Sequence, residues 1–324
     1  MTRLLIRKYV VESVLLFAAC WMMLLVFCWS RIWIVAQFDL DQFKPLLRQF
    51  KAFERFSPVP LEQFLTYAGS IAMQYNEPVL ILCVVVWAIS RGSDVVSGEL
   101  GRGTMEMLLA QPISRTRLLL CHGGVSTVGL GLLCVAVFLG THFGIATNSV
   151  TETIQPTIQI KVPFLPAQIP LPTGEAEEID VSLADRVDSG LFVAPTMNLF
   201  GFGFFLLGLS SMVSCWDRYR WRTIGIVLST YVVQFLVFVL SRSTETTGWC
   251  GYLTFFSLYQ PDAIVQLVRN EPSSTFAILN QFDVPGWPHV LAPFGMSCVF
   301  VLMGLVCYFF GWIGFRRRDL PAPL

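Results

Sequence analysis

Six apolar stretches alternate with polar segments along the chain. They cover residues 13–34, 68–89, 118–140, 192–215, 223–240 and 291–315. Each is close to the roughly 20 residues that an α-helix needs to cross the hydrocarbon core of a bilayer. The pattern predicts an all-α polytopic membrane protein with about six transmembrane helices, which form one membrane domain over residues 1–324.

The residues before the first stretch have a different pattern. Over residues 2–12, Arg3, Arg7 and Lys8 lie on one side of a helix and leucine and valine side chains lie on the other. This is typical of an amphipathic helix at a membrane surface. We therefore expect an N-terminal interfacial helix, followed by a separate first span.

Four longer polar segments join the apolar stretches. Residues 90–117 form one of them, and residues 35–67, 141–191 and 241–290 form the others. The first outer segment contains an amphipathic pattern over residues 41–56, which predicts a surface helix. The second is rich in proline and acidic residues and holds a short alternating piece over 157–162, so we expect it to be mostly irregular. The third predicts one or two interfacial helices.

Basic residues give the chain an orientation. Clusters occur around residues 3–8, 91–117, 218–222 and 316–318, which an even number of spans places on one side. Because cytoplasmic loops carry an excess of Lys and Arg, this side is predicted to be cytoplasmic, with both termini on it. The basic residues between 44 and 55 are an exception. The expected location is the cytoplasmic membrane, with the chain crossing it several times.

Composition agrees with a membrane protein. Of 324 residues, 54% are apolar and only 14% are charged, against about 25% charged in soluble domains. The formal net charge is zero, so no global charge favours nucleic acid as a partner. The nine cysteines have no ligand or redox spacing, and eight of them lie in or beside apolar stretches. We interpret them as small apolar residues rather than disulfide or metal sites.

No motif for catalysis is present. The chain has no HExxH, no GxSxG and no phosphate-binding GxxxxGK[ST] sequence. We therefore expect neither an enzyme nor a metal or cofactor held by this chain. Three polar residues near or within spans are candidates for a substrate path: Glu77, Asn198 and Gln234. For Glu77 the alternative is a solvated helix end, and for the other two it is hydrogen bonding between helices.

The stretch from Asp94 to Arg117 is the longest polar interruption on the basic side. Its glycines, Gly98, Gly101 and Gly103, predict a flexible entry. Thr104 is a candidate N-cap for a short helix over residues 105–110, on which Met105, Leu108 and Leu109 share an apolar face. Pro112 ends that helix, and Ser114 is placed to cap the next one. A helix this short needs a surface to pack on, which is either the chain's own helix ends or a partner protein.

The sequence GELGRGTMEMLLAQPISRTRLLL resembles the segment between the second and third transmembrane helices of ATP-binding-cassette permeases of the ABC-2 class. The residues that carry the resemblance are Glu99, Gly103, Thr104, Glu106, Leu108, Leu109, Pro112, Ser114 and Arg115. Together with Arg102, they are the candidates for docking a partner protein. The Pro78-led second span, the Gly208-x-Ser210-Ser211 sequence and the Tyr259-x-Pro261 loop agree with it.

The resemblance implies a six-helix half-transporter that pairs with a second permease copy or a homologue. It also implies an ATP-binding-cassette ATPase subunit that docks at this loop and carries ATP and Mg²⁺, so that the complex exports a substrate. Two alternatives remain open on sequence grounds: a secondary transporter driven by an ion gradient, and a membrane assembly factor without transport activity.

Overall fold

The computed structural model describes residues 2–37, 66–154, 157–161, 168–172, 177–280 and 290–318. Six helical segments in these ranges are long and apolar enough to cross a membrane: Thr2–Ala36, Tyr67–Gly101, Arg115–Thr147, Ser189–Trp216, Arg220–Ser243 and Pro293–Arg317. The predicted all-α polytopic class is thereby confirmed. The surface helix expected over residues 41–56 lies outside the described residues and stays a prediction.

The first helix differs from the predicted division into two parts. Helix α1 runs without a break from Thr2 to Ala36, so the expected interfacial helix and the first span form one continuous helix. Leu5, Tyr9 and Ser13 are buried along it, because its first three turns pack against other helices. The basic residues of this region therefore flank a packed helix end.

The second span is built from several pieces. It comprises α3 (Tyr67–Ala72), the 3₁₀ turn η3 (Met73–Asn76), α4 (Pro78–Ser93), the π-helical η4 (Asp94–Gly98) and α5 (Glu99–Gly101). Pro78 does not interrupt a helix but begins α4, and Glu77 before it is extended with ψ 136°, as a residue before proline prefers. The helix continues beyond the predicted end at residue 89, so the first part of the expected 90–117 loop is helical.

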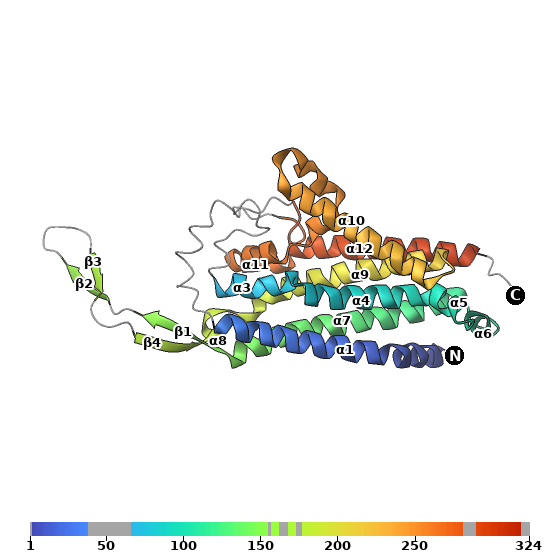
Figure 1. Ribbon diagram of the computed structural model, residues 1–324, viewed down its shortest axis with the longest axis horizontal. Coiled ribbons are helices and arrows are strands. Elements are labelled where there is room, and N and C mark those ends of the chain that lie inside the picture. Colours follow the sequence, from blue (N-terminus) through green and yellow to red (C-terminus); the bar gives the residue numbers. More distant parts are fainter. Residues whose placement is uncertain are drawn as a thin grey trace.

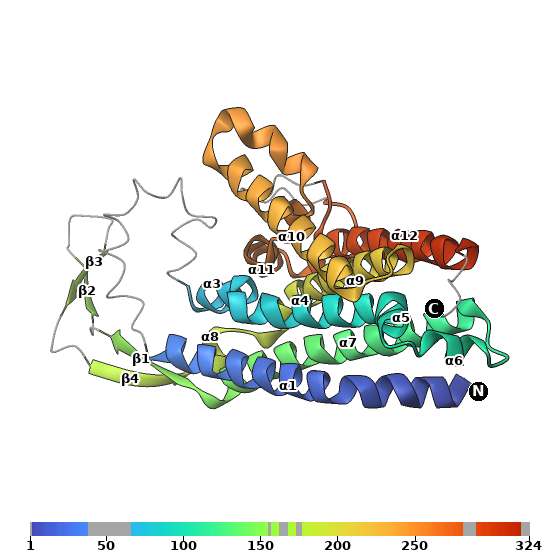
Figure 2. The same cartoon turned by 45° about the vertical axis from the view of Figure 1, so that its right-hand side comes forward.

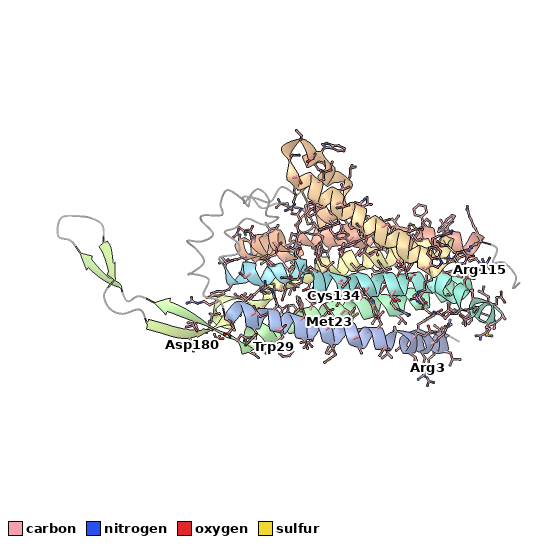
Figure 3. All side chains as sticks on the ribbon, in the orientation of Figure 1. Arg3, Met23, Trp29, Arg115, Cys134 and Asp180 are labelled. Atoms are coloured by element: carbon pink, nitrogen blue, oxygen red, sulfur yellow. The ribbon has the colours of Figure 1, made fainter. Side chains whose placement is uncertain are left out.

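All six segments run alongside one another except α10, which tilts away from the others (Figures 1 and 2). The start of α1 and the end of α12 (Pro293–Arg317) lie together at one end of the bundle, which we call the termini end. The opposite end is the distal end. Arg3 and Arg115 lie at the termini end, whereas Trp29 and Asp180 lie toward the distal end (Figure 3).

The distal end carries a β-ribbon that was not predicted. After α7 (Arg115–Thr147), strand β1 (Ser149–Ile154) pairs antiparallel with β4 (Glu177–Ser182). Between them β2 (Thr157–Lys161) pairs antiparallel with β3 (Gln168–Pro172), where β2 matches the predicted alternating piece. The ribbon extends away from the bundle (Figure 1). It leads through α8 (Leu183–Arg186) and η5 (Ser189–Phe192) into the next span.

Short helices cover the distal end between α10 (Arg220–Ser243) and α12. They are η6 (Glu245–Leu253), η7 (Phe255–Leu258), α11 (Pro261–Asn270) and η8 (Pro272–Phe276). Helix α11 buries Ile264, Val265, Leu267 and Val268, so it packs on the bundle through one side. Short helices were expected in this segment.

Helix α9 (Val193–Trp216) forms the centre of the bundle. Most of its residues are buried, and the ring of Phe202 lies within contact range of aromatic rings from α10, η7 and α12, including Phe300 at 5.7 Å. Glycines bring α9 and α12 close together, because a Cβ on Gly208 would lie 2.6 Å from the carbonyl oxygen of Gly304. Small residues allow such approach in lipid, where packing drives helix association.

Substituting Gly208 tests this close packing. Gly208→Val would force α9 and α12 apart and is expected to lower the free energy of unfolding by about 2 kcal/mol. The matched control is Gly124→Val on α7, where no atom lies within 4 Å of the added Cβ. Thermal unfolding of the purified protein in detergent measures both variants. Equal melting temperatures for them would contradict the packing described.

Candidate functional site

Residues 94–117 leave the second span as a continuation of its helix. Gly98 is buried in the π-helical turn, where an added Cβ would clash with the carboxylate of Asp94. Gly103 has a left-handed backbone with φ 71°, which glycine adopts at little cost, and it ends the helix. The predicted flexible glycine entry is therefore wrong: one glycine makes room for a side chain and another sets a turn.

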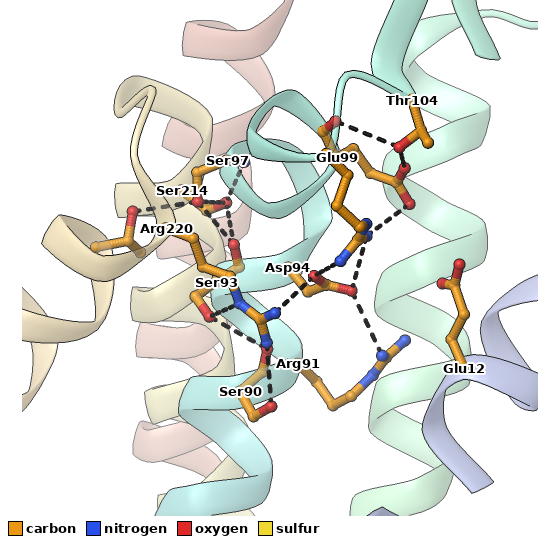
Figure 4. Close-up of polar contacts among 12 residues, drawn as sticks. Glu12, Ser90, Arg91, Ser93, Asp94, Ser97, Glu99, Thr104, Ser214 and Arg220 are labelled. Atoms are coloured by element: carbon orange, nitrogen blue, oxygen red, sulfur yellow. Dashed lines mark hydrogen bonds and ion pairs between the residues drawn. The ribbon is translucent and has the colours of Figure 1, made fainter. Parts of the chain in front are cut away.

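Asp94 is the centre of a buried ion cluster (Figure 4). Its side chain is almost fully buried and contacts three guanidinium groups. Arg102 Nη1 donates to Oδ1 at 2.7 Å, Arg220 Nη1 lies 3.3 Å from Oδ1, and Arg91 Nη1 lies 3.7 Å from Oδ2. Because Arg220 begins α10, Asp94 joins the second and fifth spans. A buried charge requires such partners, since leaving one unpaired costs several kcal/mol.

Glu99 extends the cluster to the first helix. Its side chain is buried, and its Oε1 accepts a hydrogen bond from Lys8 Nζ at 2.6 Å and lies 3.2 Å from Arg102 Nη2. Arg102 thus bridges both carboxylates. Its hydrogen bond with Asp94 raises the pKa of the guanidinium further above its usual value, so Arg102 stays charged. Lys8 ties α1 to the same point.

Small polar side chains hold the π-helical turn itself. Ser214 of α9 accepts hydrogen bonds from the backbone N–H of Val96 at 3.2 Å and of Ser97 at 3.0 Å, and its hydroxyl also lies 3.0 Å from the carbonyl oxygen of Ser93. A π-helical turn leaves backbone groups misaligned, so outside partners stabilise it. The small residues of α9 therefore pack its helix closely and also fix the shape of η4.

Helix α6 (Met105–Leu109) follows as a short tip, which points away from the bundle at the termini end (Figure 1). Thr104 occupies the predicted N-cap position of α6, but its side chain makes no capping hydrogen bond there. Instead the Thr104 hydroxyl donates to the carboxylate of Glu99. This hydrogen bond closes the turn between α5 and α6, so it fixes the tip against the ion cluster.

The predicted apolar face of α6 points inward. Met105 and Leu108 are buried in a cluster with Leu5 and Tyr9 of α1 and Phe315 of α12. The surface that α6 leaves exposed consists of Glu106 and Met107, followed by Ala110, Gln111 and Pro112. Met107 is 72% exposed. The chain's own helix ends therefore cover the face expected to dock, and a different face is free.

At the C-terminal end of the segment, Ser114 acts as predicted, whereas Arg115 binds within the chain. The Ser114 hydroxyl accepts the N–H of Arg117 at 3.3 Å and caps α7, which confirms the predicted cap. Arg115 was a docking candidate, but its guanidinium donates to the carbonyl oxygens of Phe315 at 2.9 Å and Arg318 at 2.7 Å. It therefore joins the start of α7 to the end of α12.

The three candidates for a substrate path do not meet. Glu77 lies 3.4 Å from Arg31 Nε, Asn198 donates to the carbonyl oxygen of Leu258 at 3.1 Å, and the backbone of Gln234 accepts from Thr254. No hydrogen bond or ion pair joins these three residues to one another in the described part of the chain. Nor do the described residues contain a group of His, Cys, Asp or Glu suited to a metal ion.

Sequence reasoning missed Asp94, Arg91, Arg220 and Lys8 as members of one site. One feature was available: Arg91 and Asp94 stand three residues apart directly after an apolar stretch, a spacing that puts them on the same helix face. Charges at the end of a span are expensive unless paired. That feature identifies a local ion pair, but it does not identify Lys8 or Arg220.

Asp94→Asn tests the ion cluster. The substitution leaves three guanidinium groups around a neutral side chain, so the free energy of unfolding is expected to fall by about 3 kcal/mol. Glu12→Gln is the matched control, because Glu12 is partly exposed and lies 3.6 Å from Lys8 Nζ; its effect should be within about 0.5 kcal/mol. Intrinsic fluorescence during heating measures both. A wild-type melting temperature for Asp94→Asn would refute the role assigned to the cluster.

Comparison with known proteins agrees with this architecture. A family model described as ABC-2 family transporter protein matches residues 7–320, which is almost the whole chain. No curated protein matches the chain at a significant level. The match includes all six candidate spans and the ion cluster, so it concerns the complete membrane domain. The chain belongs to the ABC-2 family of transporter membrane proteins.

Proposed function

We propose that the chain is the permease subunit of an ATP-binding-cassette exporter in the cytoplasmic membrane. A separate nucleotide-binding subunit carries ATP and Mg²⁺, docks on the tip of residues 94–117 and moves the spans, which carry a substrate of unidentified class. The family match supports a multi-pass permease of this kind. The geometry of the tip supports the docking position.

One observation carries the proposal: an exposed tip is fixed to several spans through buried ions. Residues 110–112 and the Glu106–Met107 side of α6 are exposed. A few residues away, Glu99 and Asp94 bind Lys8 of α1 and Arg220 of α10. A push on the tip therefore reaches the first, second and fifth spans without passing through a flexible loop. A docking element needs both accessibility and a stiff connection.

The surface of the tip has suitable chemistry for a protein partner. Met107 offers a flexible apolar side chain in the middle of the exposed face, and Glu106 lies beside it. Interfaces are commonly built from an apolar centre with charged residues around it. Leu108, by contrast, is buried within the chain, so its substitution would disturb the tip itself before it reported on a partner.

Helix α10 supports pairing with a second permease copy. Thr223 and Val227 are its only buried residues, so most of its surface faces outward although it is a candidate span. A groove of about 560 Å³ follows one side of it and includes Gly225, Ser229 and Gln234. Small residues four apart allow two helices to approach closely in lipid. We therefore place the contact between copies on this side of α10.

Docking on the tip is tested with Met107→Asp and Glu106→Lys. Both changes are at exposed positions, so the permease is expected to fold normally. We expect the amount of nucleotide-binding subunit that co-purifies from native membranes to fall at least about tenfold, together with the ATP hydrolysis of the purified complex. Tyr252→Asp is the control, because Tyr252 is 94% exposed on η6 at the distal end. Unchanged co-purification in both tip variants would rule out this docking site.

Pairing through α10 is tested by cysteine cross-linking in membranes. In a background with the exposed Cys298 replaced by serine, Ser229→Cys should give a covalent dimer on oxidation. Leu132→Cys, at an exposed position on α7, is the matched control and should stay monomeric. A dimer band for Leu132→Cys but not for Ser229→Cys would place the interface elsewhere.

A further inference from the structure

The break in the second span is held by helix α11 at the distal end. Asn76 Nδ2 of η3 donates to Asp262 Oδ2 in the first turn of α11. Next to this bond, Tyr259 Oη donates to the carbonyl oxygen of Tyr75 at 2.7 Å. Tyr75 Oη in turn lies 2.8 Å from Thr196 Oγ1 of α9. We call the contact formed by Asn76, Asp262, Tyr75 and Tyr259 the outer clasp.

Asp262 has an unusual position for a carboxylate. It is only 8% exposed, on a helix whose neighbouring residues Ile264 and Val265 are buried and apolar. One oxygen accepts from Asn76, whereas the other, Oδ1, is buried and has no hydrogen bond within the described part of the chain. An ionised carboxylate with one bare oxygen in apolar surroundings is costly, and a neutral carboxyl group costs less.

The charged and titratable groups around the clasp do not compensate this cost. Helix α11 packs against α3, η3, η5, α9 and η8. Of these, α3 and η3 contribute the phenols of Tyr67 and Tyr75, and the other three contain no Asp, Glu, Lys, Arg, His or Tyr. The charge that acts on Asp262 is that of Arg242 on α10. Glu77, which follows Asn76 in the chain, pairs with Arg31. Arg269 and Glu271 are exposed at the other end of α11.

Burial raises the pKa of Asp262 to about 6, against the opposing effects of the Asn76 hydrogen bond and the Arg242 charge. In an opened clasp Asp262 meets water and returns toward its ordinary value of 3.8. Between these values the closed clasp binds more protons than the open one, so closing is favoured at low pH and weakens as pH rises through about 6. A difference of two pKa units corresponds to about a 100-fold change in the ratio of closed to open forms.

We propose that Asp262 is a protonation site: when neutral it locks the distal half of the second span to α11, and when ionised it releases that half. The neutral carboxyl still accepts the Asn76 hydrogen bond. The ionised group draws water to Oδ1 and so separates α11 from the helix break. In a permease this would make the distal exit of the path sensitive to the pH outside. That consequence rests on the proposed function, but the clasp itself does not.

Hydrogen exchange of the full-length protein in lipid nanodiscs measures the clasp directly. Peptides covering residues 67–78 and 261–270 are followed from pH 5 to pH 8, with labelling times adjusted for the chemical exchange rate. We expect protection in both peptides to fall together by about 10-fold as pH rises from 5 to 8. No ATPase is present, so failure of the docking proposal would leave this result unaffected.

Three variants make the test specific. Asp262→Asn keeps an acceptor for Asn76 but cannot ionise, so its protection should not change with pH. Asn76→Ala removes a donor that lowers the pKa of Asp262, so the transition should move to higher pH; this variant also serves if Asp262→Asn fails to fold. Glu271→Gln, at the exposed end of α11, should behave as wild type. Protection that does not change with pH in the wild type, or a pH dependence of protection in Asp262→Asn equal to that of the wild type, would overturn the proposal.

Discussion

A carboxylate buried at the end of a membrane span sets the constraints on this protein. Asp94 is almost fully buried, and its charge is tolerable there because three guanidinium groups reach it from three directions. Meeting this requirement fixes several other features. Gly98 must lack a side chain, η4 must widen into a π-helical turn, and α10 must begin where Arg220 can contact the acid. The termini end of the bundle is organised around the carboxylate of Asp94.

The same constraint explains how a short helix is held in place. A five-residue helix is unstable alone, and α6 is held by the Glu99 contacts on one side and by the apolar cluster with Leu5 and Phe315 on the other. Arg115 then joins α7 to the end of α12. These contacts and the Asp94–Arg220 ion pair connect the 94–117 segment to the first, second, third, fifth and sixth candidate spans. The buried polar and apolar contacts, rather than the length of α6, hold the tip in place.

Hydropathy predicted the six spans because crossing a bilayer requires a long apolar stretch, and this requirement acts locally along the chain. The same logic failed at residues 90–101. Arg91, Asp94 and Glu99 look like part of a polar loop in the sequence, but in the structure they continue the helix. The sequence does not reveal this, because Arg220 and Lys8, which pair with Asp94 and Glu99, lie far away along the chain. Thr104 is a residue type that commonly caps helices, but its hydroxyl donates a hydrogen bond to the carboxylate of Glu99 instead of capping α6. Such pairings depend on tertiary contacts that a single sequence does not contain.

For the 94–117 segment, the sequence predicted a short helix with an apolar face but not the direction of that face. The apolar spacing of Met105 and Leu108 was recognised, and burial of that face against α1 and α12 left Met107 outward instead. The β-ribbon was missed because the proline-rich segment has weak alternation outside β2. Glu77, Asn198 and Gln234 each satisfied a polar-in-span pattern, but they bind separate neighbours and not one another.

If the chain works as proposed, the tip and the second span move as one body when the nucleotide-binding subunit binds ATP. Spin labels at Met107 and at Leu82, which is exposed on α4, report this within one chain of the reconstituted complex. We expect the distance between these two labels to stay constant between the nucleotide-free and ATP-bound states, while the distance between Met107 labels in the two copies changes. A change in the Met107–Leu82 distance as large as the change between copies would show that the tip moves independently of the second span, contrary to the proposed coupling.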